Sequence, residues 1–204
     1  MLGRSLIRLE GMRKMILDLL DLTHIESGKK KRDITQIDVR DIAQLAIEGV
    51  APDADQRHIA IQLQAPQSVP MLADSNEIEI ILNNLISNAV KYNRDGGKVD
   101  ITLSQDTATT SPRTTIQVAD TGIGMTPDDA ARLFNDFVRI KNEKTVHILG
   151  SGLGLSIVKK LARLYDGDVA VASEPDVGST FTVVLGQPVP EPTPADKPQD
   201  DHTA

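Results

Sequence analysis

The segment 80–93 is mostly apolar but carries polar side chains whose types and spacing suit chemistry. Asn84, Asn88 and Lys91 stand at i, i+4 and i+7, which on a helix places all three on one face. Amide oxygens can bind a hard cation, and a lysine ammonium can bind phosphate. A solvated helix face is the alternative interpretation, although asparagine is a poor helix former and Glu, Lys or Gln would suit such a face better.

Two glycine-containing segments supply further candidate ligand contacts. Asp120 ends an alternating apolar stretch and is followed by Gly122 and Gly124. Its carboxylate only accepts hydrogen bonds, so it suits an exocyclic amine such as that of adenine, unless the segment is an ordinary turn. Segment 149–162 runs three glycines into a helix, whose free N–H groups can bind phosphate. Neither segment matches the dinucleotide-binding or P-loop pattern, so both of those nucleotide folds are disfavoured.

The elements that must position these residues are predicted by hydrophobic periodicity. The predicted strands are 58–63, 98–104, 114–120, 168–173 and 179–185, and the predicted helices are 40–54, 76–92, 127–135 and 155–166. The last two strands follow each other closely and predict a hairpin, so the sheet is mixed. The expected fold class is α+β: a two-layer α/β sandwich with about five strands and helices on one face.

Capping residues sharpen the predicted helix boundaries. Asp74 precedes Glu77 by three residues and resembles a capping box. Thr126 is a predicted N-cap before Pro127. Gly167 is the expected residue just past the end of the last helix.

Composition divides the chain into three zones. Residues 1–28 form a predicted N-terminal amphipathic helix, which Gly28 would end. This helix needs a partner helix from another segment or another chain. Residues 33–186 are the predicted compact domain, and the Pro-rich, acidic residues 187–204 are an expected disordered tail or linker. The predicted apolar stripe of the helix consists of Leu2, Leu6, Leu9, Met12, Ile16, Leu19, Leu20 and Leu22.

Bulk composition excludes several function classes. The chain of 204 residues has a formal net charge of −7, which argues against nucleic-acid binding, and no cysteine for disulfides or thiolate metal sites. No apolar run reaches the roughly 18 residues of a membrane span, and no signal peptide is visible. We expect a cytoplasmic protein segment without membrane contact.

Together, three of these segments resemble the nucleotide-binding boxes of one family. NLISNAVKYN, DTGIGM and GSGLGL resemble, in this order, the N, G1 and G2 boxes of the sensor histidine kinase ATP-binding domain. That family belongs to the group that includes gyrase, the heat-shock-ninety chaperones and the MutL repair proteins. LFNDFVRI resembles the F box, and LLDLTHIESGK resembles the end of the second dimerisation helix. The resemblance implies the Bergerat ATP-binding fold over 33–186, and the dimerisation segment disfavours a serine-kinase anti-sigma regulator.

The resemblance implies ATP and Mg²⁺ as cofactors and assigns roles to individual residues. Asn88, with Asn84, would hold Mg²⁺ between the ATP phosphates, Lys91 would contact phosphate, and Tyr92 would line the pocket. Asp120 would bind the adenine amino group. The glycines of the G1 box would leave room for the base, and the segment 139–150 would be a mobile ATP lid carrying Lys141 and Lys144. The remaining implied ATP-binding residues are Gly122, Ile123, Gly124, Arg139, Gly150, Ser151, Gly152, Leu153, Gly154 and Leu155.

The sequence departs from the family pattern at the phosphoacceptor. The motif that usually carries the substrate histidine is absent, and none of the four histidines matches it: His24, His58, His147 and His202. The F box also has Asn135-Asp136 where Glu-Pro is common.

The implied activity is therefore that of an ATP-dependent protein histidine kinase whose acceptor histidine lies outside this chain. Its implied partners are a histidine-bearing dimerisation domain, a response regulator receiver domain and, at full length, a second copy. The chain could be the cytoplasmic part of a membrane-anchored sensor. The alternative is a nucleotide-binding regulatory or scaffolding module without transfer activity.

Overall fold

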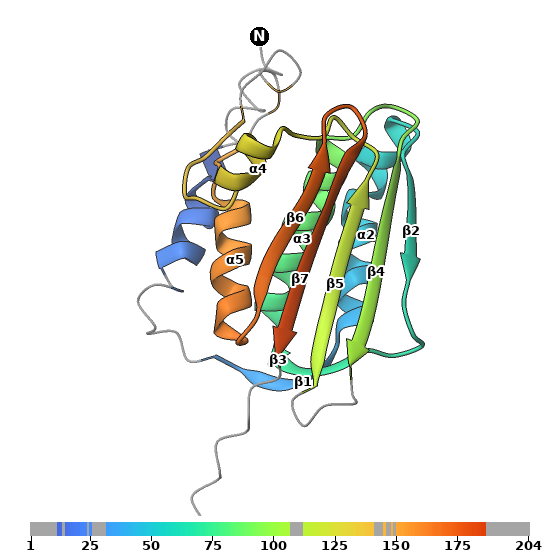
Figure 1. Ribbon diagram of the computed structural model, residues 1–204. Helices are drawn as coiled ribbons and strands as arrows, with labels where there is room; N and C mark the ends of the chain where they lie inside the picture. Colours follow the sequence, from blue (N-terminus) through green and yellow to red (C-terminus); the bar gives the residue numbers. More distant parts are fainter. Residues whose placement is uncertain are drawn as a thin grey trace, which may run out of the picture.

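The computed structural model describes residues 12–13, 15–23, 25, 32–106, 112–140, 145, 148 and 150–186 (Figure 1). Five strands form one sheet in the order β2-β4-β5-β7-β6. β2 pairs parallel with β4, and the other three pairs are antiparallel, which confirms the predicted mixed sheet. The bounds of these strands are β2 (Ala60–Gln64), β4 (Lys98–Asp106), β5 (Arg113–Asp120), β6 (Asp168–Glu174) and β7 (Gly178–Gly186).

Among the elements that the structure describes, three helices cover one face of this sheet and none covers the other face (Figure 1). They are α2 (Val39–Gln56), α3 (Ser75–Lys91) and α5 (Gly154–Leu164), and the short helix α4 (Pro127–Arg132) lies beyond one end of the sheet. Alternate residues of β4, β5 and β7 point toward the helices and are fully buried, as are the apolar positions of α3. This is the predicted two-layer α+β architecture.

A second, two-stranded sheet was not predicted. β1 (Ile34–Asp38) pairs antiparallel with β3 (Pro70–Asp74). Three of the five β1 residues are exposed and β3 begins with proline, so neither segment carries a clear alternating pattern. Each strand runs directly into a helix, since Asp38 caps the start of α2 and Asp74 caps the start of α3.

Two of the predicted helix-end details need correction. Asp74 is the N-cap of α3, but Glu77 does not complete a capping box: the Asp74 N–H donates to Tyr165 Oη (3.0 Å), and Glu77 pairs with Arg32. At the end of α5 the left-handed residue is Asp166 (φ 48°), not Gly167. Gly167 is needed because a Cβ there would overlap the carbonyl oxygen of Val184.

The other predicted helix boundaries agree closely with the structure. Thr126 caps α4 with Pro127 at its start, as predicted, although α4 ends at Arg132 and not at 135. His58 lies in a turn with φ 53°, two residues before β2 and not at its start.

The N-terminal segment is helical at residues 12–13, 15–23 and 25, where the structure describes it. Its face toward the domain consists of Asp18, Leu22 and Ile25, at i, i+4 and i+7. Of the five described residues of the predicted stripe, only Leu22 is buried against the domain, whereas Met12, Ile16, Leu19 and Leu20 are exposed, as are Met15 and Leu17. Gly28, residues 2–11 and the predicted tail 187–204 lie outside the described residues. In the described part of the chain, no helix combines the length and apolar character needed to cross a membrane.

Candidate functional site

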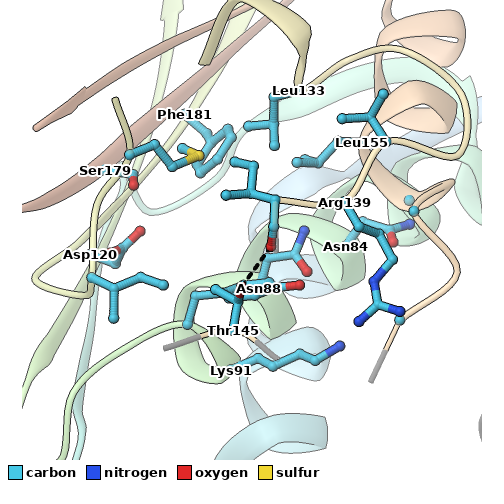
Figure 2. A pocket seen from close by; sticks show the side chains of 18 of the residues that line it. Asn84, Asn88, Lys91, Asp120, Leu133, Arg139, Thr145, Leu155, Ser179 and Phe181 are labelled. Carbon is cyan, nitrogen blue, oxygen red and sulfur yellow. Dashed lines mark hydrogen bonds between the residues drawn. The ribbon is translucent and has the colours of Figure 1, made fainter. Parts of the chain in front are cut away.

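The polar face of α3 forms one wall of a pocket at the end of the sheet. Asn84, Asn88 and Lys91 all line this pocket (Figure 2). The apolar residues of α3 point the other way, into the core, so burial of that face orients the three polar side chains. The predicted one-sided arrangement of these residues is therefore present in the structure.

The start of α5 faces this wall at very short range. Asn84 Nδ2 donates to the carbonyl oxygen of Ile80 (2.8 Å), and its Oδ1 lies against Gly154, where a Cβ would overlap it. Gly150 lies beside Lys91 Nζ, 3.3 Å from the position that a Cβ would occupy. The glycine-rich segment thus packs its backbone directly on the polar side chains of α3.

Asp120 lies at the end of β5, on the other side of the pocket from Arg139 (Figure 2). Its Oδ1 accepts a hydrogen bond from the N–H of Gly122 (2.8 Å). Burial raises the pKa of Asp120 to about 6, although the N–H groups of Gly122 and Ser179 act in the opposite direction. The carboxylate is therefore ionised at neutral pH and can accept a hydrogen bond from an amine.

The two glycines after Asp120 make room for the protein's own main chain. A Cβ at Gly122 would overlap the carbonyl oxygen of Tyr92, and one at Gly124 would overlap that of Glu174. Gly124 also has φ 59°, which favours glycine. The N–H of Ile123 donates to the same Tyr92 carbonyl (3.1 Å), which ties the G1 segment to the end of α3.

The described part of the lid segment contacts the pocket through a few residues. Arg139 Nη2 donates to the carbonyl oxygen of Ile148 (2.6 Å), and Thr145 Oγ1 donates to that of Ile140 (2.7 Å; Figure 2). Lys141 and Lys144 lie outside the described residues.

The unusual F box is tied to α5 by an ion pair. Asp136 Oδ2 lies 3.0 Å from Lys160 Nζ, and hydrogen bonds from Ser156 and Lys160 lower the pKa of Asp136. Where the family commonly has proline, this chain thus has a carboxylate that binds the last helix.

Thirteen of the fifteen predicted site residues line this one pocket. Gly122 and Leu153 do not, and Leu153 is fully buried in the core. The residues that sequence reasoning missed are mainly apolar. Met125 and Leu133 could have been found because they lie within the G1 and F box segments, whereas nothing local singled out Asp18, which reaches the pocket from the N-terminal helix. The full missed set is Asp18, Met125, Leu133, Val138, Ile140, Thr145, Ser179 and Phe181.

The donor set of the pocket fits a hard cation only if the ligand supplies most of the oxygens. Among the described residues there is no group of three or more His, Cys, Asp or Glu side chains that could hold a metal ion. The carboxamides of Asn84 and Asn88 are the neutral oxygen donors of the α3 wall. Mg²⁺ commonly uses one or two protein ligands and completes its shell with phosphates and water, so this pair fits that ion.

No acceptor histidine is placed at the pocket by the described residues. His58 does not line it. The other three histidines, His24, His147 and His202, lie outside the part of the chain that the structure describes.

Comparison with known proteins decides the family. Residues 73–189, more than half of the chain, match the family described as histidine kinase-, DNA gyrase B- and HSP90-like ATPase. The chain belongs to this ATPase family. The matched residues include the amide, carboxylate and glycine positions of the pocket described above.

Several relatives of this chain are named as sensor kinases. The sensor-like histidine kinase SenX3 of Mycobacterium tuberculosis is 34% identical over 182 residues, which are 89% of this chain and 43% of SenX3. The sensor protein GacS of Pseudomonas syringae is 31% identical over 181 residues, 88% of this chain and 20% of GacS. The relatives place the ATPase in the sensor histidine kinase branch, and the chain spans less than half of their length.

Solved structures share the fold of this chain. Full-length ShkA in complex with AMPPNP superposes with a TM-score of 0.72 at 29% identity, over 86% of this chain and 36% of that one. The histidine kinase AdeS of Acinetobacter baumannii superposes with a TM-score of 0.73 over 91% of this chain and 84% of that one. At 22% identity, AdeS supports the fold alone.

Proposed function

We propose that this chain provides the catalytic domain of a two-component protein histidine kinase, which binds Mg-ATP and transfers the γ-phosphoryl group to a histidine supplied by another segment or chain. The observation that carries the proposal is a single pocket with an amide pair, a lysine and a glycine-rich helix start on one side and a buried carboxylate on the other. In this proposal residues 33–186 are the catalytic domain, 1–28 the end of a dimerisation segment and 187–204 a tail or linker.

The adenine end of the site is formed around Asp120. Its ionised carboxylate accepts a hydrogen bond from the exocyclic amine of adenine, which guanine does not present at that position. Ile123, Met125 and Phe181 line the same pocket and provide apolar contacts for the flat ring. ShkA, which has the same fold, was solved in complex with the nucleotide AMPPNP, and this supports nucleotide binding by the present chain.

The phosphate end is formed where α3 meets α5. The first turn of α5 offers main-chain N–H groups and the positive end of the helix dipole, which favour phosphate. Lys91 and Arg139 line this part of the pocket and supply positive charge. Asn84 and Asn88 hold the cation that neutralises the phosphates when Mg-ATP is bound.

In the proposed reaction an imidazole nitrogen of the acceptor histidine forms a bond to the γ-phosphorus. The bond between that phosphorus and the β–γ bridging oxygen breaks, and ADP leaves with the electron pair. The imidazole proton passes to a base on the acceptor segment. The residues of this chain position the nucleotide and neutralise charge, which is the main contribution a protein makes to phosphoryl transfer.

The proposed partners follow from the surfaces that the described residues leave exposed. The apolar face of the N-terminal helix, from Met12 to Leu20, suits helices of a histidine-bearing dimerisation domain, including those of a second copy. A response regulator receiver domain is the proposed final acceptor of the phosphoryl group, and the cytoplasm the proposed location.

The test is transfer in trans. The chain is mixed with a histidine-bearing dimerisation domain and γ-labelled ATP, and acid-labile label on that domain is the expected result. Asn88→Ala should reduce Mg-dependent ATP binding and labelling at least about tenfold. The matched control is Asn83→Ala, since Asn83 is exposed on α3 and, among the described residues, its side chain bonds to Glu79 one turn away (3.4 Å). ATP binding without any label would favour the regulatory module instead.

A further inference from the structure

The nucleotide pocket contains a carboxylate that comes from outside the catalytic domain. Asp18 of the N-terminal helix lines the pocket together with Asn84, Lys91 and Ser151. Its Oδ2 accepts a hydrogen bond from Ser151 Oγ (2.5 Å), across a separation of 133 positions in the sequence. Ser151 Oγ in turn accepts from the N–H of Leu153 (3.2 Å). Asp18 is thus joined to the loop that leads into the phosphate end of the site.

Packing of the helix holds this carboxylate in place. Asp18 is 7% exposed, and Leu22 on the next turn is 6% exposed. Ile25, one further turn along, packs against the domain core as Leu22 does. The helix therefore rests on the domain beside the start of α5 with one continuous face (Figure 1). Asp18 is buried by that contact and is not a solvated side chain on a free helix.

The position of Asp18 matters because of the charge of the nucleotide. A buried carboxylate repels a phosphate within a few ångströms far more strongly than an exposed one would. Compared with ADP, ATP carries additional negative charge on its γ-phosphate. In the proposed binding mode this end of the triphosphate lies toward the G2 segment. ADP lacks that group. The docked helix therefore disfavours ATP more than it disfavours ADP.

We propose that Asp18 is a specificity-determining residue of the nucleotide site: docked on Ser151, its carboxylate selects ADP over ATP, and ATP binding is coupled to release of the helix. The inference rests on the proposed function, since it assumes that nucleotide phosphates lie at this end of the pocket. Because coupling is reciprocal, ATP weakens docking of the helix by the same factor by which docking weakens ATP. Loss of the γ-phosphate by transfer then allows the helix to dock again.

The first test measures the dissociation constants of ATP and ADP by calorimetry on the full chain. Asp18→Asn keeps the size of the side chain and can still accept from Ser151 Oγ, but it removes the charge. We expect it to tighten ATP about tenfold relative to ADP. Glu48→Gln, an equal charge change at an exposed position of α2, should leave the ratio unchanged. If the ratio of the ATP and ADP dissociation constants does not change in Asp18→Asn, even where both nucleotides bind more tightly, the inference is overturned but the proposed function is not. If no variant binds either nucleotide, the proposed function is overturned.

The second test follows the helix directly. The chain has no cysteine, so Met12→Cys and Val177→Cys give two unique labelling sites. Met12 is 62% exposed and Val177 is 56% exposed. Each cysteine is given a spin label, and the distance between the two labels is measured by electron paramagnetic resonance. This distance should lengthen with AMPPNP and stay at the nucleotide-free value with ADP. Introducing Asp18→Asn into the labelled chain should remove the difference between the nucleotides. If the labelled chain that retains Asp18 shows the same distance with AMPPNP and with ADP, ATP binding is not coupled to release of the helix.

Discussion

Gly154 and Asn84 pack together in the wall of the pocket so closely that a Cβ on Gly154 would overlap Asn84 Oδ1. The other end of the same carboxamide donates to the Ile80 carbonyl, so it cannot simply rotate away without losing that hydrogen bond. The start of α5 thereby sets the position of the oxygen that we assign to the cation. This contact explains why the G2 segment has glycine at position 154, where α5 begins.

Gly154→Ala should therefore weaken Mg-dependent ATP binding. The new methyl group displaces the Asn84 carboxamide, and we expect a loss of about tenfold in affinity, measured by calorimetry with Mg²⁺ present. The loss should shrink when Mg²⁺ is chelated, since the displaced oxygen then has no cation to bind. The matched control is Gly49→Ala on α2, where no heavy atom lies within 4 Å of the new Cβ. That variant should gain about 0.5–1 kcal/mol in stability and bind ATP normally.

ATP affinity should rise with pH through the titration of Asp120. Burial raises its pKa to about 6, so below that pH the carboxyl is protonated and no longer accepts from the adenine amine through a charged oxygen. Affinity should fall by up to about tenfold for each pH unit below 6. Titrations from pH 5 to pH 8 with Asp120→Asn as the reference separate this effect from protonation of the phosphates. If the variant and the native chain show the same pH profile, Asp120 is not the titrating group.

Asp120 should also make the stability of the nucleotide-free chain depend on pH. Its folded-state pKa of about 6 lies above the ordinary value of 3.8, so folding favours the protonated form. The stabilising contribution is complete below about pH 3.8 and is lost as the pH rises through about 6. Asp120→Asn should accordingly increase the free energy of unfolding by about 1–3 kcal/mol at pH 7, with a much smaller gain near pH 4. Urea denaturation at the two pH values measures the difference, and equal gains at both would contradict the assignment.

Tyr165→Phe should destabilise the domain although it removes only one oxygen. Tyr165 Oη donates to Glu77 Oε2 (2.6 Å) and accepts from the Asp74 N–H (3.0 Å), while Arg32 lies over the ring, 4.5 Å from its centroid. Burial and the Glu77 carboxylate raise the pKa of Tyr165, so the hydroxyl stays protonated and remains a donor. We expect a loss of about 1–3 kcal/mol because the Asp74 N–H loses its acceptor and the buried Glu77 carboxylate loses one of its donors while keeping Arg32.

Chemical denaturation measures the loss in Tyr165→Phe, and a double-mutant cycle with Arg32→Met tests the network. Arg32 and Tyr165 both bind Glu77, so the two losses should be non-additive. Simple additivity would show that the three side chains do not act together.

Most of the sandwich could be predicted because its signals are local. The strands β4, β5, β6 and β7 alternate clearly, and α3 and α5 carry apolar stripes that a single window of sequence reveals. The two-stranded sheet was missed because β1 is largely exposed and β3 begins with proline, so neither segment shows a strand pattern of its own. These strands are stabilised by pairing with each other, although they are distant in the sequence. Glu77 was misassigned for a similar reason, since its partners Arg32 and Tyr165 lie 45 and 88 positions away.

The amino-acid sequence by itself determined the layers, the helix starts at Asp74 and Thr126, and the side chains of the candidate site, because periodicity, capping and residue type act over a few neighbouring positions. Only the tertiary structure decided what these side chains meet. It placed Gly154 on Asn84, buried Asp120 enough to raise its pKa, and brought Asp18 to Ser151. Each of these depends on packing between elements distant in sequence, which no local pattern encodes.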